Sequence, residues 1–280
     1  MKVAFLQDFF HTEIIGGAEQ NDCVLLDYLQ QQDGLTVVPI HTYHFESIVD
    51  CYDFFVVSNF VKLSEVAKDY LIQKKNYIIY EHDHKYVNTR NPANFNKFTI
   101  PKQNIINYEF YKNAKKVFVL SKICKSVIED TLNINNVCNI GCSLWSEEKL
   151  NLIRKLEKDS SNDFKFSVMN SQNPIKGLKQ AMAFCKKKGI EPQLIGNKDY
   201  NFFMSQMAKT EHFIFLPQVL ETFSRIIAEA KMLNCKIVTT PIMIGFFSED
   251  YSDLSGNKLI DKIEEQISLA LPQFKDSILS

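Results

Sequence analysis

The sequence lacks the features that define several large classes of protein. Its seven cysteines are scattered, odd in number and nowhere arranged as Cys-x-x-Cys, so we expect neither a disulfide framework nor a zinc knuckle. No apolar run approaches the length of a membrane span. The opening segment, 1–6, is too short and too soon interrupted by Gln7 and Asp8 for a secretory signal. We therefore expect a cytoplasmic protein, with a peripheral position on a membrane as the alternative.

An excess of charge of either sign is also missing. The 32 lysine and arginine residues balance 33 aspartate and glutamate residues, which indicates no class of partner. The 45% hydrophobic and 23% charged residues are typical of a soluble globular protein. A chain of 280 residues is long for one core and fits two compact domains.

Short apolar segments alternate with helical patterns along almost the whole chain. Such alternation is typical of parallel sheets that are covered by helices on both faces. It is interrupted near 143–163, so we predict an N-terminal domain at 1–145, a linker at 146–163 and a C-terminal domain at 164–280. The last helical pattern, about 257–271, is a candidate to pack back on the first domain. The expected strands are 2–7, 36–40, 54–58, 77–80, 116–120, 164–168, 192–195, 212–216 and 236–239.

Ligands bind beyond the carboxyl ends of the strands in an open parallel sheet, so the loops that follow strands are the places to search. Four such loops carry unusual residues. They are 7–17, which ends in Gly16 and Gly17 before a helix, the Glu-His-Asp-His segment 81–84, the loop 170–177 with Lys176, and the segment 217–229.

The segment 217–229 is the most informative, because Glu221 and Glu229 follow directly on the apolar run 213–216. The pattern places Glu221 just before a helix and Glu229 about two turns into it. If both lay on the helix, they would be roughly 12 Å apart, a span that suits the sugar and the ribose of a nucleotide sugar. The free amides of Phe223, Ser224 and Arg225 would then face a diphosphate. The alternative is an amphipathic helix with a solvated glutamate.

Together these loops resemble those of the retaining glycosyltransferases of the GT-B fold, and they are most similar to glycosyltransferase family 4. The resemblance covers nearly the whole chain. It implies two Rossmann-like parallel-sheet domains that face a cleft. It also implies a hexosyltransferase that moves a sugar from a UDP- or GDP-sugar to a hydroxyl acceptor with retention of configuration, without metal or cofactor.

The resemblance also assigns roles to individual residues. Gly16 and Gly17 resemble the glycine loop that approaches the donor phosphates. His82 would contact the transferred sugar, and Lys176, before Gly177, would be the cation on the diphosphate. Glu221 would bond sugar hydroxyls and Glu229 the ribose hydroxyls. The implied catalytic set is His82, Glu221 and Lys176, and the donor-binding set adds Gly16, Gly17, Phe223, Ser224, Arg225 and Glu229. The candidates on the acceptor side are Glu19, His84, Lys85 and Arg90.

One position departs from the family pattern, which usually has an arginine five residues before the lysine. That position is Ser171 in this sequence. A diphosphate leaving group normally takes two cations, because charge develops on it in the transition state. Lys179, Arg225 and Lys122 are candidates to substitute. The departure leaves open a catalytically silent module with the GT-B fold.

Each motif also has a plainer interpretation. The two glycines could form an ordinary tight turn, and Lys176 could be a solvated lysine at a helix start. The histidines at 82 and 84 could be a metal pair. Since Glu81 or Asp83 would have to complete the ligand set in strained geometry, no metal site is expected.

A separate signal is the basic segment 85–125, where nine basic residues face a single acidic one, Glu109, and aromatic residues are interleaved. Clustered lysines attract anionic lipid headgroups and nucleic acid, so a modified nucleic-acid base is an alternative acceptor. A solvated face is the plainer interpretation. Residues 91–101, rich in Asn and Pro, predict a mobile loop that could cover the acceptor. The basic residues are Lys85, Arg90, Lys97, Lys102, Lys112, Lys115, Lys116, Lys122 and Lys125.

Overall fold

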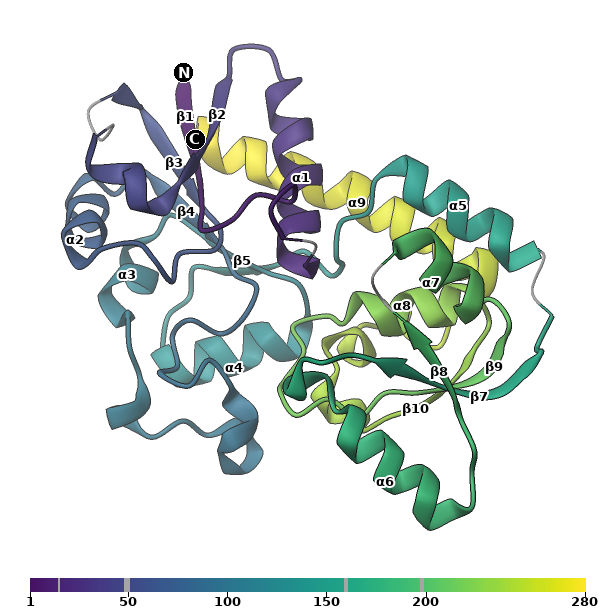
Figure 1. Ribbon diagram of the computed structural model, residues 1–280. Helices are drawn as coiled ribbons and strands as arrows, with labels where there is room; N and C mark the ends of the chain where they lie inside the picture. The colour runs from purple at the N-terminus through teal and green to yellow at the C-terminus, as the bar shows by residue number, and fades with distance from the viewer. Residues whose placement is uncertain (15, 48–50, 159–160, 197–198) are drawn as a thin grey trace. The chain divides into compact units, whose positions relative to one another are not determined.

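The computed structural model describes residues 1–14, 16–47, 51–158, 161–196 and 199–280. The chain forms two compact units, each with its own parallel sheet (Figure 1). Unit 1 comprises Met1–Trp145 and Gln266–Ser280, and unit 2 comprises Ser146–Glu265. Residues 159 and 160 of the expected linker, and Ile15 before the two glycines, lie outside the described residues.

Unit 1 contains a six-stranded sheet in the order β2-β1-β3-β4-β5-β6, in which all neighbouring strands are parallel. The side chains of Phe54–Val57 and Tyr77–Tyr80 are almost completely buried, which explains their uninterrupted apolar sequences. The order of the strands reverses between β1 and β3, so the carboxyl ends of these strands form a switch point. The strands are β1 (Lys2–Gln7), β2 (Thr36–His41), β3 (Phe54–Val57), β4 (Tyr77–Tyr80), β5 (Val117–Val119) and β6 (Val137–Asn139).

Helices and short 3₁₀ turns connect these strands. The α-helices before the domain boundary are α1 (Gly17–Gln30), α2 (Glu65–Lys74), α3 (Tyr108–Asn113) and α4 (Lys122–Leu132). The 3₁₀ turns are η1 (Thr42–Ser47), η3 (Pro92–Asn94), η4 (Asn96–Phe98) and η5 (Lys102–Asn104). The segment 91–101 therefore consists largely of two hydrogen-bonded turns, and its mobility stays a prediction.

Unit 2 contains a four-stranded parallel sheet in the order β10-β9-β7-β8. Its switch point lies between β7 and β9, and helices cover both faces (Figure 1). The strands are β7 (Phe164–Asn170), β8 (Gln193–Gly196), β9 (Thr210–Ile214) and β10 (Lys236–Val238). The helices are α5 (Glu147–Lys158), α6 (Leu178–Lys188), α7 (Tyr200–Met207), α8 (Arg225–Met232) and α9 (Gly256–Leu279), with 3₁₀ turns η6 (Pro174–Lys176), η7 (Pro241–Met243) and η8 (Gly245–Ser248).

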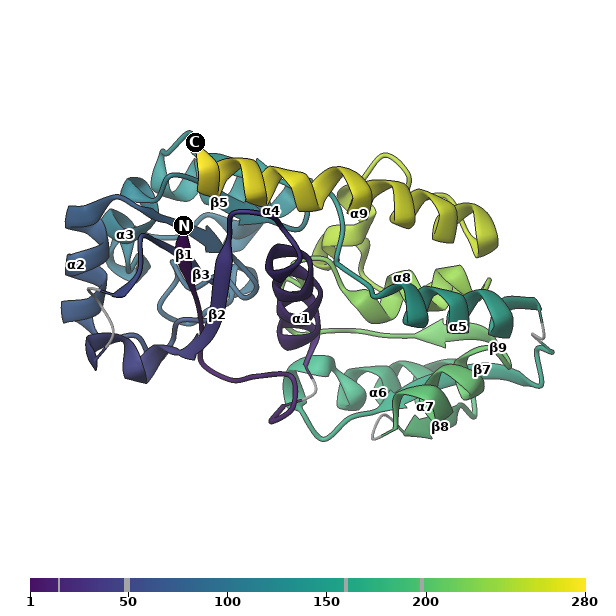
Figure 2. The ribbon, with the colours of Figure 1, turned by 90° about the horizontal axis from the view of Figure 1, so that it is seen from above.

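The last helix, α9, is longer than the sequence pattern predicts, and its residues from Gln266 onward belong to unit 1. There the ring of Phe274 stacks on Phe118 of β5 at 4.0 Å between centroids and meets the edge of Tyr80 at 5.0 Å. Figure 2 shows this part of α9 running beside β5. A long helix is thus anchored in the core of unit 1 by an aromatic cluster.

The predicted fold class is confirmed, since all nine expected strands are present and parallel. The sequence analysis missed β6, which is only three residues long and has one buried side chain, that of Val137. In the part of the chain that the structure describes, no helix is long and apolar enough to span a bilayer.

Candidate functional site

His82 lies directly after β4, and side chains from two other elements fix it. Its Nε2 lies 3.0 Å from Oδ1 of Asp22 on α1. The hydroxyl of Ser58, the first residue after β3, donates to the same oxygen at 2.5 Å. The side chains of His82 and Asp22 are only 4% and 1% exposed. A buried carboxylate therefore fixes the orientation of this imidazole, and the sequence analysis did not identify Asp22.

Glu19 joins the same group from the first turn of α1. Its carboxylate folds back over Gly16, where an added methyl carbon would lie 2.2 Å from Glu19 Oε2. Burial raises the pKa of Glu19 above its ordinary value, and the Asp22 carboxylate adds to this effect. Its own backbone N–H, His82 and Asn59 oppose the change. The absence of a side chain at Gly16 thus makes room for a partly desolvated carboxyl group next to His82.

Glu81 and Asp83, on either side of His82, hold a buried lysine. The ammonium of Lys85 donates to Glu81 at 3.1 Å and to Asp83 at 2.6 Å. The hydroxyl of Tyr111 also donates to Glu81. Burial alone would raise the pKa of Glu81, but Lys85, Tyr111 and the Asp83 amide together lower it to about 2. The loop 81–84, which we call the histidine loop, is therefore stabilised by a charged network. The side chains of Lys85 and Glu81 in this network are 2% and 1% exposed.

The second histidine of this loop points elsewhere. His84 adopts a left-handed backbone conformation, with φ of 59°, and its Nδ1 lies 3.1 Å from the hydroxyl of Tyr86. Across the described residues, no group of three or more His, Cys, Asp or Glu side chains is placed to hold a metal ion. Of the four acceptor-side candidates, Lys85 and Arg90 line one common pocket, whereas Glu19 and His84 do not.

In unit 2, the loops after β7 and β9 are bonded to each other. The amide of Gln218 donates to the carbonyl of Ile175 at 2.8 Å. Gly177 has φ of +73°, and an added methyl carbon would lie 1.7 Å from the carbonyl oxygen of Leu216. Only glycine permits this approach of two backbones. It allows Lys176 Nζ to donate to Glu221 Oε1 at 2.8 Å, which joins two of the predicted donor-binding residues.

The start of α8 differs from the predicted geometry. Glu221 forms a bridge to Ile244 and lies in an extended loop, because the helix starts only at Arg225. Glu229 is consequently about one turn into α8 rather than two. Ser224 precedes the helix with φ of 72°, and its buried hydroxyl oxygen has no hydrogen-bond partner among the described residues. A buried hydroxyl without a partner at a helix N-terminus suits an anionic or hydroxylated ligand.

Glu229 is buried, and its neighbours include Tyr200 and Arg225. The hydroxyl of Tyr200, the first residue of α7, donates to Glu229 Oε1 at 2.9 Å, and Arg225 Nη2 lies 3.9 Å from the same oxygen. Burial, followed by the Glu229 charge, raises the pKa of Tyr200 well above its ordinary value. The tyrosine therefore remains a donor, and it is a further site residue that the sequence analysis missed.

Ser171 occupies the position where the resembled family carries an arginine. Its Oγ accepts a hydrogen bond from the amide of Asn173 at 3.3 Å and so stabilises the turn before Lys176. Among the proposed substitutes, Arg225 lies beside Glu229, and Lys179 is exposed on α6.

The basic segment 85–125 does not form one uniform surface. Lys85 is buried and neutralised, whereas the exposed Lys115 and Lys116 precede β5 and Lys122 follows it. The lysines before and after this strand therefore lie at opposite ends of β5. Lys112 and Lys125 also have acidic neighbours, Glu109 at 4.0 Å and Glu129 at 3.7 Å.

Comparison with known proteins supports the fold but no family membership. No protein-family model matches this sequence, and no curated protein sequence matches it. The crystal structure of Anabaena Alr3699/HepE in complex with UDP and glucose is similar to the chain, with a TM-score of 0.52, 14% identity and coverage of 98% of this chain and 100% of that one. An alpha-glucosyltransferase in complex with UDP and a 13-mer DNA containing a HMU base gives a TM-score of 0.55, with 11% identity and 100% coverage of both chains. The two parallel-sheet units therefore have the GT-B fold.

Proposed function

We propose that the protein is a glycosyltransferase that moves a sugar from a nucleotide-diphosphate donor to a hydroxyl acceptor. The single observation that carries the proposal is the donor cluster, which we define as Lys176, Glu221, Ser224, Arg225 and Glu229 in unit 2. Backbone contacts join its two loops at the carboxyl ends of β7 and β9, on both sides of the switch point. Open parallel sheets bind nucleotides at such a place.

Three members of the donor cluster and the start of α8 have chemical tasks in this proposal. Lys176 and the start of α8 stabilise the charge that develops on the leaving diphosphate. Glu229 accepts hydrogen bonds from the ribose hydroxyls while Tyr200 fixes its orientation at 2.9 Å. Glu221 accepts from hydroxyls of the transferred sugar. In this proposal the helix dipole and Lys176, rather than a bound metal, stabilise the leaving diphosphate.

His82 completes the proposal on unit 1 as the group that contacts the transferred sugar. Its contact with Asp22 restricts the ring to one orientation, which is what a positioning contact to a sugar requires. We further propose that transfer retains the anomeric configuration, through attack of the acceptor on the face from which the diphosphate departs. NMR spectroscopy of the first product formed tests retention directly, since an inverted anomer contradicts it.

UDP is the first nucleotide to test, because the two similar structures described above contain UDP. The experiment measures binding of UDP, GDP, ADP and CMP by calorimetry to the wild-type protein, Glu229→Ala and a control, Glu191→Ala. Glu191 is exposed and precedes β8. It therefore lies at the amino-terminal ends of the strands, whereas the donor cluster lies at their carboxyl ends. Loss of a charged hydrogen-bond partner costs about 1.5–3 kcal/mol, so we expect Glu229→Ala to weaken binding by roughly tenfold to a hundredfold.

The control variant should bind the same nucleotide with wild-type affinity. Equal affinities of Glu229→Ala and wild type, or no binding of any nucleotide to the wild type, would contradict the proposal. Release of UDP from UDP-glucose then distinguishes an enzyme from a silent module that only binds. Turnover with duplex DNA containing hydroxymethylated bases, but with no saccharide acceptor, would favour the modified-base alternative.

A further inference from the structure

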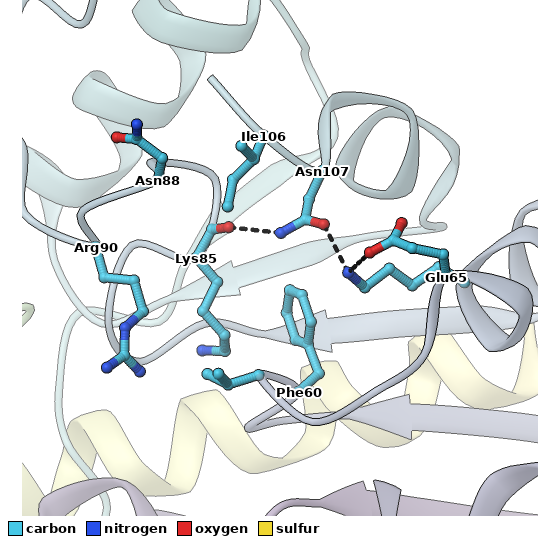
Figure 3. A pocket seen from close by; sticks show the side chains of 9 residues that line it. Phe60, Glu65, Lys85, Asn88, Arg90, Ile106 and Asn107 are labelled. Atoms are coloured by element: carbon cyan, nitrogen blue, oxygen red, sulfur yellow. Dashed lines mark hydrogen bonds and ion pairs between the residues drawn. The ribbon is translucent and has the colours of Figure 1, made fainter. Parts of the chain in front are cut away.

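A pocket of about 500 Å³ lies within unit 1, on the side of β3 and β4 where α2 and α3 begin (Figure 3). Residues of four segments line it, namely 60–61 after β3, 65 and 68 on α2, 85, 88 and 90 after β4, and 106–107 before α3. Its volume is within the range of roughly 300–1,000 Å³ that is typical of small-molecule sites. None of the residues assigned to the donor belongs to its lining.

The charges of the pocket wall cancel. Three cations line the pocket, and three carboxylates bind them, so the wall carries no uncompensated positive charge. The pairs are Lys68–Glu65 at 2.7 Å, Lys85–Glu81 at 3.1 Å, Lys85–Asp83 at 2.6 Å and Arg90–Asp83 at 2.9 Å. A phosphate group would lie next to these carboxylates and would have to share their cations. This arrangement favours a neutral ligand over an anionic one.

Both polar groups and apolar side chains line the same wall. Asn107 donates to the carbonyl of Lys85 at 2.7 Å and accepts from Lys68 Nζ at 2.9 Å, so its amide is fixed (Figure 3). Val61 and Ile106 are 53% and 40% exposed and offer apolar surface. An entirely apolar ligand would leave the ammonium, guanidinium and amide groups without solvent. A saccharide, which has both hydroxyls and C–H faces, satisfies both kinds of surface.

The wall is also connected to the histidine loop. Glu81 and Asp83, which bind the pocket cations, are the residues immediately before and after His82. A ligand in the pocket would therefore lie against the loop that carries the proposed sugar-contacting residue.

We propose that this pocket binds a neutral saccharide and that this saccharide is the acceptor of the transferred sugar. The role as acceptor rests on the proposed function, whereas saccharide binding does not. The occupant is an uncharged hydroxylated group, and neither a phosphorylated headgroup nor a nucleic acid fits the charge of the wall.

The matched variants Val61→Trp and Val66→Trp test the location. Both valines are exposed, at 53% and 69%, but only Val61 lines the pocket. Saturation-transfer NMR is recorded on the full chain with cellobiose, maltose, lactose and N,N′-diacetylchitobiose. Inorganic phosphate, glucose 6-phosphate and a DNA oligonucleotide are added as competitors. Thermal unfolding of each variant checks that it is folded.

We expect at least one of the four disaccharides to bind wild type and Val66→Trp equally, and Val61→Trp at least tenfold more weakly. Equal binding to both variants would overturn the location. Absence of binding by all four disaccharides, or displacement by any of the anionic competitors, would overturn the neutral-saccharide assignment. These measurements contain no nucleotide. If the protein binds UDP but no saccharide in the pocket, only this inference is refuted. Saccharide binding without any nucleotide binding refutes the glycosyltransferase instead.

Discussion

Replacing Gly177 by alanine tests the contact on which the donor cluster depends. The new methyl carbon would lie 1.7 Å from the Leu216 carbonyl oxygen, whereas real contacts of this kind are essentially never below 3.0 Å. One of the two backbones must therefore move by at least the difference, 3.0 minus 1.7, or 1.3 Å. Neither partner is a flexible side chain, so the movement separates the loop of Lys176 from the loop of Glu221.

Gly189 provides a matched control in the same unit. It has φ of +65°, similar to the +73° of Gly177, but an added methyl carbon would meet no atom within 4 Å. Alanine in the left-handed region costs about 1–2 kcal/mol at either position. Gly177→Ala additionally loses the hydrogen bond from Gln218 to Ile175, worth about 1 kcal/mol, and strains the backbone. We expect a total of about 3 kcal/mol or more for Gly177→Ala and about 1–2 kcal/mol for Gly189→Ala.

Urea unfolding followed by far-UV circular dichroism measures both costs, and calorimetry with UDP measures the functional effect. Gly189→Ala should bind UDP as the wild type does, while Gly177→Ala should bind at least tenfold more weakly. Equal destabilisation by the two substitutions would show that the close approach to Leu216 is not formed. Normal UDP affinity of a destabilised Gly177→Ala would show that the loop contact does not support the nucleotide site.

Three further predictions concern buried polar groups. Tyr200→Phe removes the donor to buried Glu229 and should lower the free energy of unfolding by about 1–3 kcal/mol in urea titrations; no change would contradict the bond. Lys85→Met leaves the Glu81 carboxylate buried without its cation and should cost about 3–5 kcal/mol, partly restored by adding Glu81→Gln. Because the pKa of Glu81 is lowered to about 2, its contribution of about 3 kcal/mol is complete above pH 4.5 and lost as the pH falls towards 2. Tyr111→Phe removes a donor to this carboxylate and should shift acid unfolding to higher pH in dichroism titrations, whereas an unchanged midpoint would contradict the network.

Most strands could be predicted because their burial leaves a simple trace in the sequence. Both faces of the first sheet are covered, so 54–57 and 77–80 are uninterrupted apolar runs. β6 leaves no such trace, since only Val137 of its three residues is buried. Its identity as a strand comes from pairing with β5, which is a tertiary interaction.

The loops of the site were predictable, whereas the partners within them were not. Strand ends point to His82, Lys176 and Glu221 because ligands of parallel sheets bind there. Asp22 and Tyr200 lie on helices far away in sequence and become relevant only when the chain folds. An acidic residue three positions after Glu19, on the same helical face, was the available signal for Asp22.

The basic segment shows why charge counted along a sequence can mislead. Lys85 is part of the excess of eight positive charges, yet two carboxylates bind it in the core. Lys116 and Lys122 are six positions apart in the sequence, but β5 lies between them, so they lie at opposite ends of this strand. A count along the chain cannot distinguish such residues from a true patch, because it contains neither burial nor direction.

The charge of the donor cluster sets a condition on how it can work. Its two cations are already engaged, Lys176 with Glu221 at 2.8 Å and Arg225 near Glu229 at 3.9 Å. Ser171 supplies no further charge, so a diphosphate meets a cluster with as many carboxylates as cations. Lys176 can direct its charge to the phosphate alone only if another group donates hydrogen bonds to Glu221 in its place. The hydroxyls of the transferred sugar can do this, since an ionised carboxylate also accepts charge-assisted hydrogen bonds from hydroxyls. The proposed function thus requires an exchange in which sugar and diphosphate bind together, each replacing one half of the Lys176–Glu221 pair.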